Sequence, residues 1–262
     1  MSASHVPDDA KTRPSPFGEG LRRRRVAGQE WHVRPELAAE LLGPRGLRLE
    51  EWLAAGVAAV VKHGPHRTVY RLSLPSGTYY LKHYRLAGPR AWLQNNLRPC
   101  RAYREAAASA RVRAAGIETA DLAAAGRRVT GPFSRDSYVL SREVPGVVPL
   151  DECLGEQGAS SPRATAERRA LRRNLIERLA ALTASLHRRG LFHADYHAGN
   201  VLVRADGDAV RLWLIDLHPL RPARMTAKRR WAMLGMLAAS LSPHATRSDR
   251  RRFLKAYAAA FG

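Results

Sequence analysis

A repeat of leucines in the second half of the chain is the clearest hydrophobic pattern in the sequence. The leucines follow one another at offsets of three or four residues, which places them on one face of a helix. Gly190 comes shortly after the repeat and is typical of a helix C-terminus. We therefore predict a long amphipathic helix whose buried face carries Leu171, Leu175, Leu179, Leu182 and Leu186.

An alternation of period two marks an earlier part of the chain. Within residues 68–74, apolar side chains occupy every second position and would share one face of a strand. The turn residues Pro75-Ser76-Gly77 follow, and a second strand-like run over residues 78–84 carries Lys82 in its middle. Two such runs joined by a short turn predict an antiparallel hairpin.

The order of the remaining elements predicts two lobes. Strand patterns at 57–62 and 137–144 and a helix pattern at 99–115 come before Pro145-Gly146, whereas helix patterns at 226–241 and 250–262 come after it. We expect an α+β fold with a strand-rich N-lobe over residues 31–144 and a helix-rich C-lobe over residues 145–262. Residues 1–30 are polar, contain Arg22-Arg23-Arg24-Arg25, and are predicted to form a disordered basic arm.

Composition excludes several classes of protein. The longest apolar runs, at 53–61 and 231–241, are shorter than the roughly 18 residues of a membrane span. The N-terminus lacks the basic and apolar segments of a secretory signal. Two cysteines, Cys100 and Cys153, cannot form a disulfide framework or a cysteine-based zinc site. An integral membrane protein and a small secreted module are both disfavoured.

The net charge of +21 arises from 44 basic and 23 acidic residues. It predicts attraction to polyanions such as nucleic acid, anionic lipid headgroups or phosphorylated glycans. Charge does not choose among these partners. The sequence contains no helix-turn-helix, zinc-finger or RNA-binding signature, so a nucleic-acid-binding module ranks last among the interpretations.

Three polar residues follow the long predicted helix in a fixed order. Asp195 lies in His193-Ala194-Asp195, Asn200 comes five residues later, and Asp216 ends an apolar strand after a predicted hairpin. A hairpin brings its two ends together, so Asn200 and Asp216 should meet at one mouth. Magnesium prefers such hard oxygen ligands. One aspartate as base, followed by an asparagine and a second aspartate that hold metal, is the division of labour in kinase-type phosphoryl transfer.

The first half supplies the groups that this interpretation requires. Lys82, central in a predicted strand, can reach the α- and β-phosphates of ATP. Glu105, on the following helix, can pair with Lys82 and hold it in place. Both residues are placed by their order along the chain and not by a local motif.

These residues resemble the protein-kinase-like superfamily over roughly residues 57–241. The string His193-Ala-Asp195-Tyr-His-Ala-Gly-Asn200 followed by Ile215-Asp216 carries the likeness. Within that superfamily the chain looks most like the lipopolysaccharide kinase (Kdo/heptose kinase, WaaP-like) family. Two strings carry this closer resemblance: the lysine strand Tyr79-Tyr80-Leu81-Lys82 and the string Ile215-Asp216-Leu217-His218.

The resemblance implies ATP-dependent phosphorylation of a sugar of the lipopolysaccharide inner core in the cytoplasm, at the inner face of the membrane, with Mg²⁺ as cofactor. A peripheral contact with an anionic membrane surface is expected. His193 is expected to orient the catalytic loop rather than to transfer protons. His218, Arg221 and Arg224 follow Asp216 and are candidates for the acceptor side.

Two departures from protein kinases favour a small-molecule or glycan acceptor. Ala194 replaces the arginine with which many protein kinases read a phosphorylated activation loop. Only nine residues separate Asp216 from the helix that begins near Thr226, which leaves little room for a peptide-binding segment. In addition, the expected phosphate loop at 63–68 contains a single glycine, Gly64.

Three alternatives remain open. An aminoglycoside- or choline-kinase-like enzyme would share the catalytic string, but the many arginines disfavour a cationic acceptor. A protein kinase or a regulatory pseudokinase would fit the poor glycine loop, although retention of the three polar residues argues against a dead enzyme. Finally, His193, His197 and His218 with the two aspartates could in principle bind zinc. The sequence says nothing about the oligomeric state.

Overall fold

The computed structural model describes residues 15–18, 20–85, 99–130, 133–155, 162–206 and 209–262. The chain divides into two compact units, residues 1–107 with 121–142 and residues 108–120 with 143–262. The first unit is rich in strands and the second in helices, so the α+β expectation is confirmed. The division differs from the expected lobes because residues 108–120 belong to the second unit.

The first unit is built on an antiparallel sheet of seven strands. Its order is β1-β2-β8-β9-β7-β6-β5. From one edge to the other, the strands are Arg22–Val26, Gln29–Val33, Leu122–Thr130, Phe133–Arg142, Gly77–Arg85, Arg67–Leu74 and Ala58–His63. The predicted hairpin is β6 and β7, in which Val69 pairs with Lys82. The sequence pattern did not reveal β1, β2 or β8.

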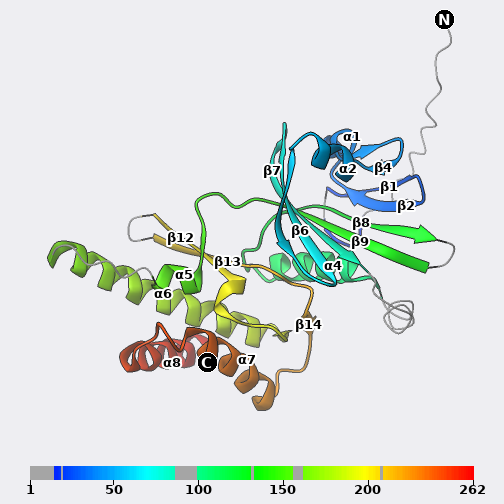
Figure 1. Cartoon of the computed structure of the whole chain (residues 1–262). Helices are drawn as coiled ribbons and strands as arrows, with labels where there is room; N and C mark the ends of the chain where they lie inside the picture. The colour runs from blue at the N-terminus through cyan, green and yellow to red at the C-terminus, as the bar shows by residue number, and fades with distance from the viewer. Residues whose placement is uncertain (1–14, 19, 86–98, 131–132, 156–161, 207–208) are drawn as a thin grey trace, which may run out of the picture. The chain divides into compact units, whose positions relative to one another are not determined.

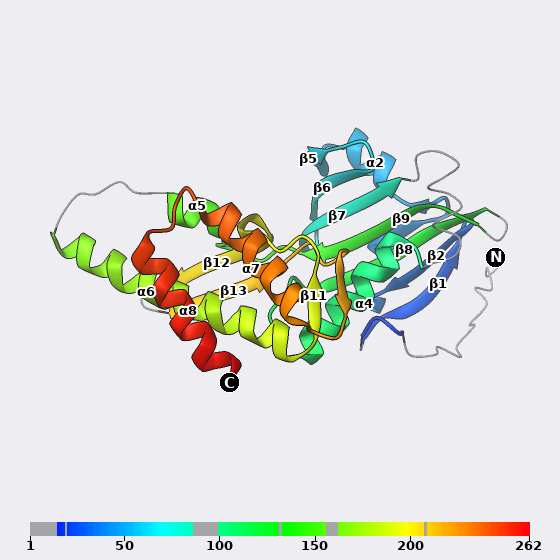
Figure 2. The same cartoon turned by 90° about the horizontal axis from the view of Figure 1, so that it is seen from below.

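Helices cover both faces of this sheet (Figures 1 and 2). Helix α4 (Arg101–Ala114) packs its alanines Ala102 and Ala106 against Val139 on one face. Helices α1 (Pro35–Leu41) and α2 (Leu49–Ala54) pack on the other face, with the hairpin strands β3 (Leu42–Gly43) and β4 (Gly46–Leu47) between them. The sheet thus presents alternate residues of each strand to two different cores.

Gly126 of β8 shows why that strand escapes a pattern search. A Cβ at Gly126 would lie 2.3 Å from the ring of Trp31, which is fully buried. The glycine therefore makes room for an indole from a neighbouring strand, and the alanines beside it have a low intrinsic preference for strands. The strand is specified by tertiary packing rather than by its own alternation.

The expected disordered arm is wrong over its last residues. Strand β1 pairs with β2 from Arg22–Val33 to Val26–Gln29, and Leu21 is buried. The physical reason is Glu30, whose carboxylate binds Arg23, Arg25 and Arg127 at 2.8, 2.6 and 2.7 Å. The carboxylate neutralises part of the arginine run and ties it to the sheet. Residues 1–14 and 19 lie outside the described part of the chain.

The second unit is mainly helical. Helix α6 (Pro162–Arg188) is the predicted amphipathic helix, and Gly190 follows it with a φ of +65°, a backbone conformation that glycine adopts without steric cost. Helices α5 (Leu150–Gly155), α7 (Ala227–Leu241) and α8 (Arg247–Phe261) accompany it, and α8 packs against α6 (Figure 2). No helix of the described residues is long and apolar enough to cross a membrane.

Short strands in the second unit carry the candidate site. Strand β10 (Val148–Pro149) pairs with β12 (Val201–Asp206), which forms the predicted hairpin with β13 (Ala209–Leu214). Strand β11 (Leu191–His193) pairs with β14 (Leu220–Pro222), and the 3₁₀ turn η1 (Ala198–Asn200) precedes β12. These pairings bring the segments around residues 193, 200, 216 and 220 together within one unit.

Candidate active site

Lys82 and Glu105 form an ion pair in the first unit. Lys82 Nζ lies 2.6 Å from Glu105 Oε1, and the two side chains come from β7 and α4. The Glu105 residue is only 5% exposed. The pairing that the sequence order suggested is therefore present. The role of the pair in phosphate binding remains a prediction.

Tyr84 completes this cluster and is a residue that sequence reasoning missed. Its hydroxyl donates a hydrogen bond of 2.5 Å to Glu105 Oε2. Residues 82 and 84 lie on the same face of β7 because side chains alternate along a strand. That period of two was the available signal. With Lys82 on one oxygen and Tyr84 on the other, the Glu105 carboxylate has a fixed orientation.

His193 lies at the end of β11 in the second unit and is fully buried. Its Nδ1 accepts a hydrogen bond of 3.2 Å from the backbone N–H of Asp195. Burial lowers the pKa of His193 to about 4, because its effect is larger than the opposite effect of the Asp216 and Asp195 carboxylates, which raise the pKa. The neutral ring can therefore accept this bond at neutral pH, an arrangement in keeping with a loop-orienting residue.

Further contacts hold the loop that follows His193. The Asn200 side chain donates from Nδ2 to the backbone carbonyl of Asp195, 2.9 Å away. Tyr196 is fully buried, and its hydroxyl lies 2.8 Å from Thr183 Oγ1 of α6. The backbone N–H of Ala198 donates to Ser240 Oγ of α7 at 2.9 Å. Thr183 and Ser240 are distant in sequence and had no detectable signal there.

This anchored loop leaves the Asp195 carboxylate accessible. The Asp195 side chain is 55% exposed, and its Oδ2 lies 3.7 Å from His197 Nε2. By contrast, Asn200 is 6% exposed. A carboxylate on a fixed backbone with an open side chain can accept a proton from a hydroxyl group that reaches it.

The β12–β13 hairpin brings Asn200 and Asp216 to one end, as its sequence predicts. Val201 pairs with Leu214, and the backbone N–H of Ile215 donates to the Asn200 carbonyl at 2.9 Å. Asp216 has a φ of +55°, in the left-handed region that few residues other than glycine, asparagine and aspartate occupy. Such a conformation costs free energy and is often found at functional sites.

His218 contacts Asp216 directly. Its Nδ1 lies 2.9 Å from Asp216 Oδ1, and the two side chains are 30% and 13% exposed. The sequence left open whether His218 is close to the proposed metal ligand or faces the acceptor. The observed contact places it beside Asp216.

The donor set of this end of the hairpin suits magnesium better than zinc. Asn200 offers an amide oxygen and Asp216 a carboxylate, and Mg²⁺ commonly takes one or two such ligands while keeping waters and phosphate oxygens. Within the described residues, no group of three or more histidine, cysteine, aspartate or glutamate side chains could hold a metal ion. The zinc alternative therefore finds no support.

Basic side chains follow the hairpin on the same unit. The guanidinium groups of Arg221 and Arg229 lie 5.3 and 6.0 Å from the ring centre of Phe192, which precedes His193. Arg224 is exposed, and its backbone carbonyl accepts a hydrogen bond of 2.7 Å from Arg229. Of the predicted acceptor-side residues, Arg221 pairs across the β11–β14 ladder with Phe192, next to the candidate catalytic loop, and both Arg221 and Arg224 are exposed.

Comparisons with known proteins identify the family of the chain. Residues 54–257 match the lipopolysaccharide kinase (Kdo/WaaP) family. The lipopolysaccharide core heptose(I) kinase WaaP of Escherichia coli is 25% identical over 205 residues, which cover 74% of this chain and 75% of that protein. The corresponding kinase of Pseudomonas aeruginosa is 30% identical over 154 residues, 56% of this chain and 55% of that one.

A solved structure of WaaP in complex with acyl carrier protein shares the fold. Its TM-score is 0.63 at 24% identity, and the match covers 87% of this chain and 88% of that chain. The family match spans most of the chain, including the Lys82–Glu105 pair and the loop and hairpin around Asp195 and Asp216. The chain belongs to the lipopolysaccharide kinase (Kdo/WaaP) family and is therefore an ATP-dependent phosphotransferase.

Proposed function

We propose that this kinase transfers the γ-phosphoryl group of ATP to a hydroxyl of a heptose or Kdo sugar in the lipopolysaccharide inner core. The single observation that carries the proposal is the family match over residues 54–257, a range that contains every proposed catalytic group. The curated relatives are named as heptose(I) kinases, which favours heptose over Kdo as the acceptor. The enzyme would act in the cytoplasm, peripherally at the inner face of the membrane.

In this proposal Asp195 is the catalytic base. It accepts the proton of the attacking sugar hydroxyl while that oxygen bonds to the γ-phosphorus and the bond to the β-phosphate oxygen breaks. Its exposed carboxylate supports this role, and so does the fixed backbone beneath it. His193, neutral because it is buried, positions Asp195 and does not exchange protons near neutral pH.

Asn200 and Asp216 would hold Mg²⁺, which neutralises charge on the ATP phosphates. Two contacts orient these ligands. The amide nitrogen of Asn200 is engaged by the Asp195 carbonyl, which turns the amide oxygen away from that carbonyl. His218 contacts one carboxylate oxygen of Asp216.

Lys82 would bind the α- and β-phosphates of ATP. Its ammonium is held by Glu105, which Tyr84 holds in turn. On the acceptor side, Arg221 and Arg224 would contact the anionic groups of the core oligosaccharide, since guanidinium groups bind carboxylate and phosphate oxygens well. Stacking against Phe192 limits the motion of Arg221.

The test is transfer of labelled γ-phosphate from MgATP to lipopolysaccharide from the source organism. Two acceptors separate the sugars: a core that ends at Kdo and a core that carries the first heptose. The variant Asp195→Asn removes the proposed base, and Asp206→Asn serves as a matched control because Asp206 is 63% exposed at the far end of the hairpin.

We expect label in the heptose-containing core with the wild type and with Asp206→Asn. With Asp195→Asn, we expect a rate at least about a hundredfold lower. Label only in the Kdo core would change the acceptor and retain the reaction. No label in either core, with label in an aminoglycoside or choline, would overturn the proposed acceptor class.

A further inference from the structure

Helix α7 presents an apolar face to solvent. Its buried side consists of Met233, Leu237 and Leu241, as expected for a helix on a core. The opposite side carries no charged residue after Lys228. Instead, Trp231 is 67% exposed, and small residues continue the same face at Ala232, Gly235, Ala238 and Ala239. A solvated helix normally carries polar side chains there, so this face is adapted to a non-aqueous contact.

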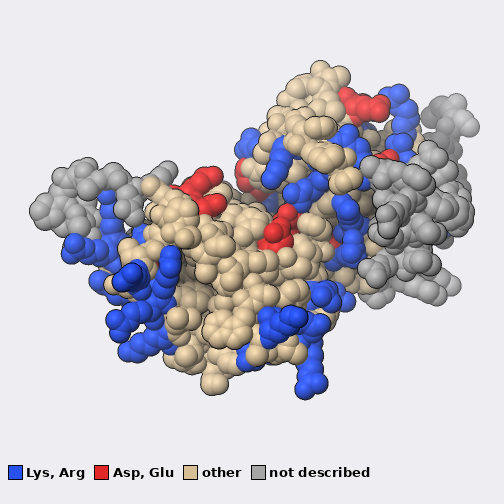
Figure 3. Space-filling model, turned by 60° about the horizontal axis from the view of Figure 1, so that its bottom comes forward, with Lys and Arg blue, Asp and Glu red and all other residues tan. Residues whose placement is uncertain are grey.

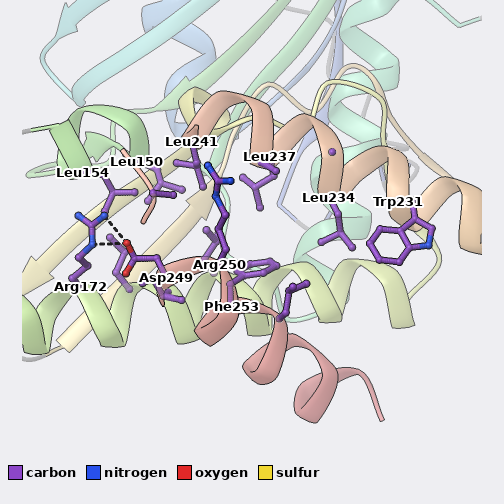
Figure 4. Close-up of a pocket in the computed structure, with 17 residues that line it drawn as sticks. Leu150, Leu154, Arg172, Trp231, Leu234, Leu237, Leu241, Asp249, Arg250 and Phe253 are labelled. Atoms are coloured by element: carbon purple, nitrogen blue, oxygen red, sulfur yellow. Dashed lines mark hydrogen bonds and ion pairs between the residues drawn. The ribbon is translucent and has the colours of Figure 1, made fainter. Parts of the chain in front are cut away.

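An apolar groove lies beside this face. It has a volume of about 300 Å³ and is lined by residues of α5, α6, α7 and α8. Trp231 and Leu234 of α7 line it together with Phe253 of α8 (Figure 4). Leu254 of α8 also lines the groove and is 50% exposed. Two large apolar side chains on different helices are therefore exposed beside the same groove.

The charge around the groove is positive. Residues 226–262 contain eight lysines and arginines and a single acidic residue, Asp249. Asp249 is 8% exposed, and Arg172 of α6 binds it at 2.8 Å, so its charge is compensated (Figure 4). By contrast, Lys228, Arg250 and Lys255 are exposed. The second unit also shows a broad uncharged surface, with basic side chains at its left and lower edges and acidic side chains only at its upper edge (Figure 3).

We propose that the α7–α8 face docks on an anionic lipid bilayer, with Trp231 and Leu254 placed in the headgroup region. Tryptophan favours that region because its ring is apolar and its indole N–H can still bond to polar groups. Exposed lysines and arginines bind the negative surface potential of the bilayer. The exposed basic side chains favour an anionic surface over a neutral one. The exposed Trp231 and Leu254 favour a membrane over a soluble polyanion, because a membrane can accept apolar side chains.

The proposed docking face is connected to the candidate active site through α7. Helix α7 supplies Ser240 to the catalytic loop, so the docking face and the loop share one rigid element. The inference extends the proposed function, which requires an acceptor anchored in a membrane. It is tested by binding alone, so failure of docking and failure of the kinase proposal are distinguishable.

The experiment is co-sedimentation of the full chain with vesicles of phosphatidylcholine alone or with added phosphatidylglycerol. One variant, Trp231→Ser, removes the inserted ring, and Val60→Ser is its control because Val60 is 55% exposed in the first unit. A second variant, Lys228→Glu with Arg250→Glu, reverses one exposed charge at the start of α7 and one on the lining of the groove. Its control is Arg22→Glu with Arg24→Glu, since either pair lowers the formal net charge from +21 to +17.

We expect binding only to the anionic vesicles, weakened about tenfold by Trp231→Ser and at least about tenfold by Lys228→Glu with Arg250→Glu. The two controls should change binding less than about threefold, and circular dichroism should show all variants folded. Equal losses of vesicle binding in the Lys228→Glu, Arg250→Glu variant and in its control would overturn the proposal, because net charge alone would then explain binding. Absence of vesicle binding, with binding to acyl carrier protein through Trp231, would also overturn it and assign the face to a protein partner.

Discussion

Tyr84 donates a hydrogen bond of 2.5 Å to Glu105, the carboxylate that binds Lys82 through its other oxygen. The side chains of Tyr84 and Glu105 are both buried. A hydrogen bond to a charged acceptor is stronger than one between neutral groups, and its loss leaves part of a buried carboxylate unsatisfied. Tyr84 is therefore a positioning residue for the ion pair.

The variant Tyr84→Phe tests this relationship. We expect kcat/KM to fall about tenfold, mostly through a higher KM for ATP, because Glu105 loses the partner that fixes its orientation. The free energy of unfolding should fall by about 2 kcal/mol. Steady-state kinetics and urea unfolding measure the two effects. Tyr79→Phe is the matched control, since Tyr79 lies on the opposite face of the same strand and its hydroxyl bonds to Ser76 in the preceding turn. Equal KM values for Tyr84→Phe and the control would refute the role.

Lys82 and Glu105 should be coupled in stability as well as in activity. The variant Lys82→Met leaves Glu105 as a buried carboxylate without its cation, so we expect a loss of about 3 kcal/mol in the free energy of unfolding. The double variant Lys82→Met with Glu105→Leu removes both charges and should recover most of that loss, while remaining inactive. A double-mutant cycle by urea unfolding measures the coupling. Additive effects of the two substitutions would argue against a stabilising pair.

Ser240 should act on turnover through the catalytic loop. The variant Ser240→Ala removes the acceptor of the Ala198 N–H. We expect kcat to fall about tenfold with little change in the KM for ATP, because the loop that carries Asp195 loses a fixed point. Ser240→Thr retains the hydroxyl and should restore at least half of the rate. If Ser240→Ala and Ser240→Thr were equally impaired, packing and not the hydrogen bond would explain the effect.

Glu30 should make the stability of the first unit depend on acid pH. Burial raises the pKa of Glu30, but hydrogen bonds from Arg127, Arg23 and Arg25 outweigh it and lower the pKa to about 2 from 4.5. A carboxylate with a lowered pKa in the folded state stabilises fully above its unfolded pKa, and the contribution disappears as the pH falls toward the folded value.

We therefore expect Glu30→Gln to lower the free energy of unfolding by about 2 kcal/mol at pH 7, and the difference from the wild type to shrink below pH 4.5. Urea unfolding at pH 7, 5, 4 and 3 measures it. Glu36→Gln is the control, because Glu36 is 68% exposed and its nearest guanidinium nitrogen, in Arg34, is 3.9 Å away. A difference for Glu30→Gln that did not vary with pH would contradict the assignment.

The elements with strong local patterns were predictable from sequence. The leucine repeat of α6 has the period of a helix, and the β12–β13 hairpin has turn residues between two apolar runs. Asn200 and Asp216 flank that hairpin, so their proximity followed from local structure. The Lys82–Glu105 pair could not be predicted from local structure, because no local pattern specifies it. The order of residues along the chain suggested the pairing.

Other features depend on contacts between distant residues. Strand β8 is alanine-rich and exists because Gly126 admits Trp31. Strand β1 is stabilised by Glu30, which offsets the charge of its arginines. Without that partner, the composition of the segment predicts a charged, disordered arm. Thr183 and Ser240 hold the catalytic loop from two separate helices. In each case the two contacting residues are far apart in sequence or lack a local pattern, so only the tertiary fold reveals the contact.

The assignment of Asp216 is tested most directly by phosphoryl transfer and MgATP binding in Asp216→Ala, compared with Asp206→Ala as a control in the same hairpin. We propose that Asp216 binds Mg²⁺ and that Asp206 does not. We therefore expect Asp216→Ala to abolish transfer of label to lipopolysaccharide and to weaken MgATP binding at least about tenfold, while Asp206→Ala retains both. Full transfer activity in Asp216→Ala would contradict the proposed role of Asp216.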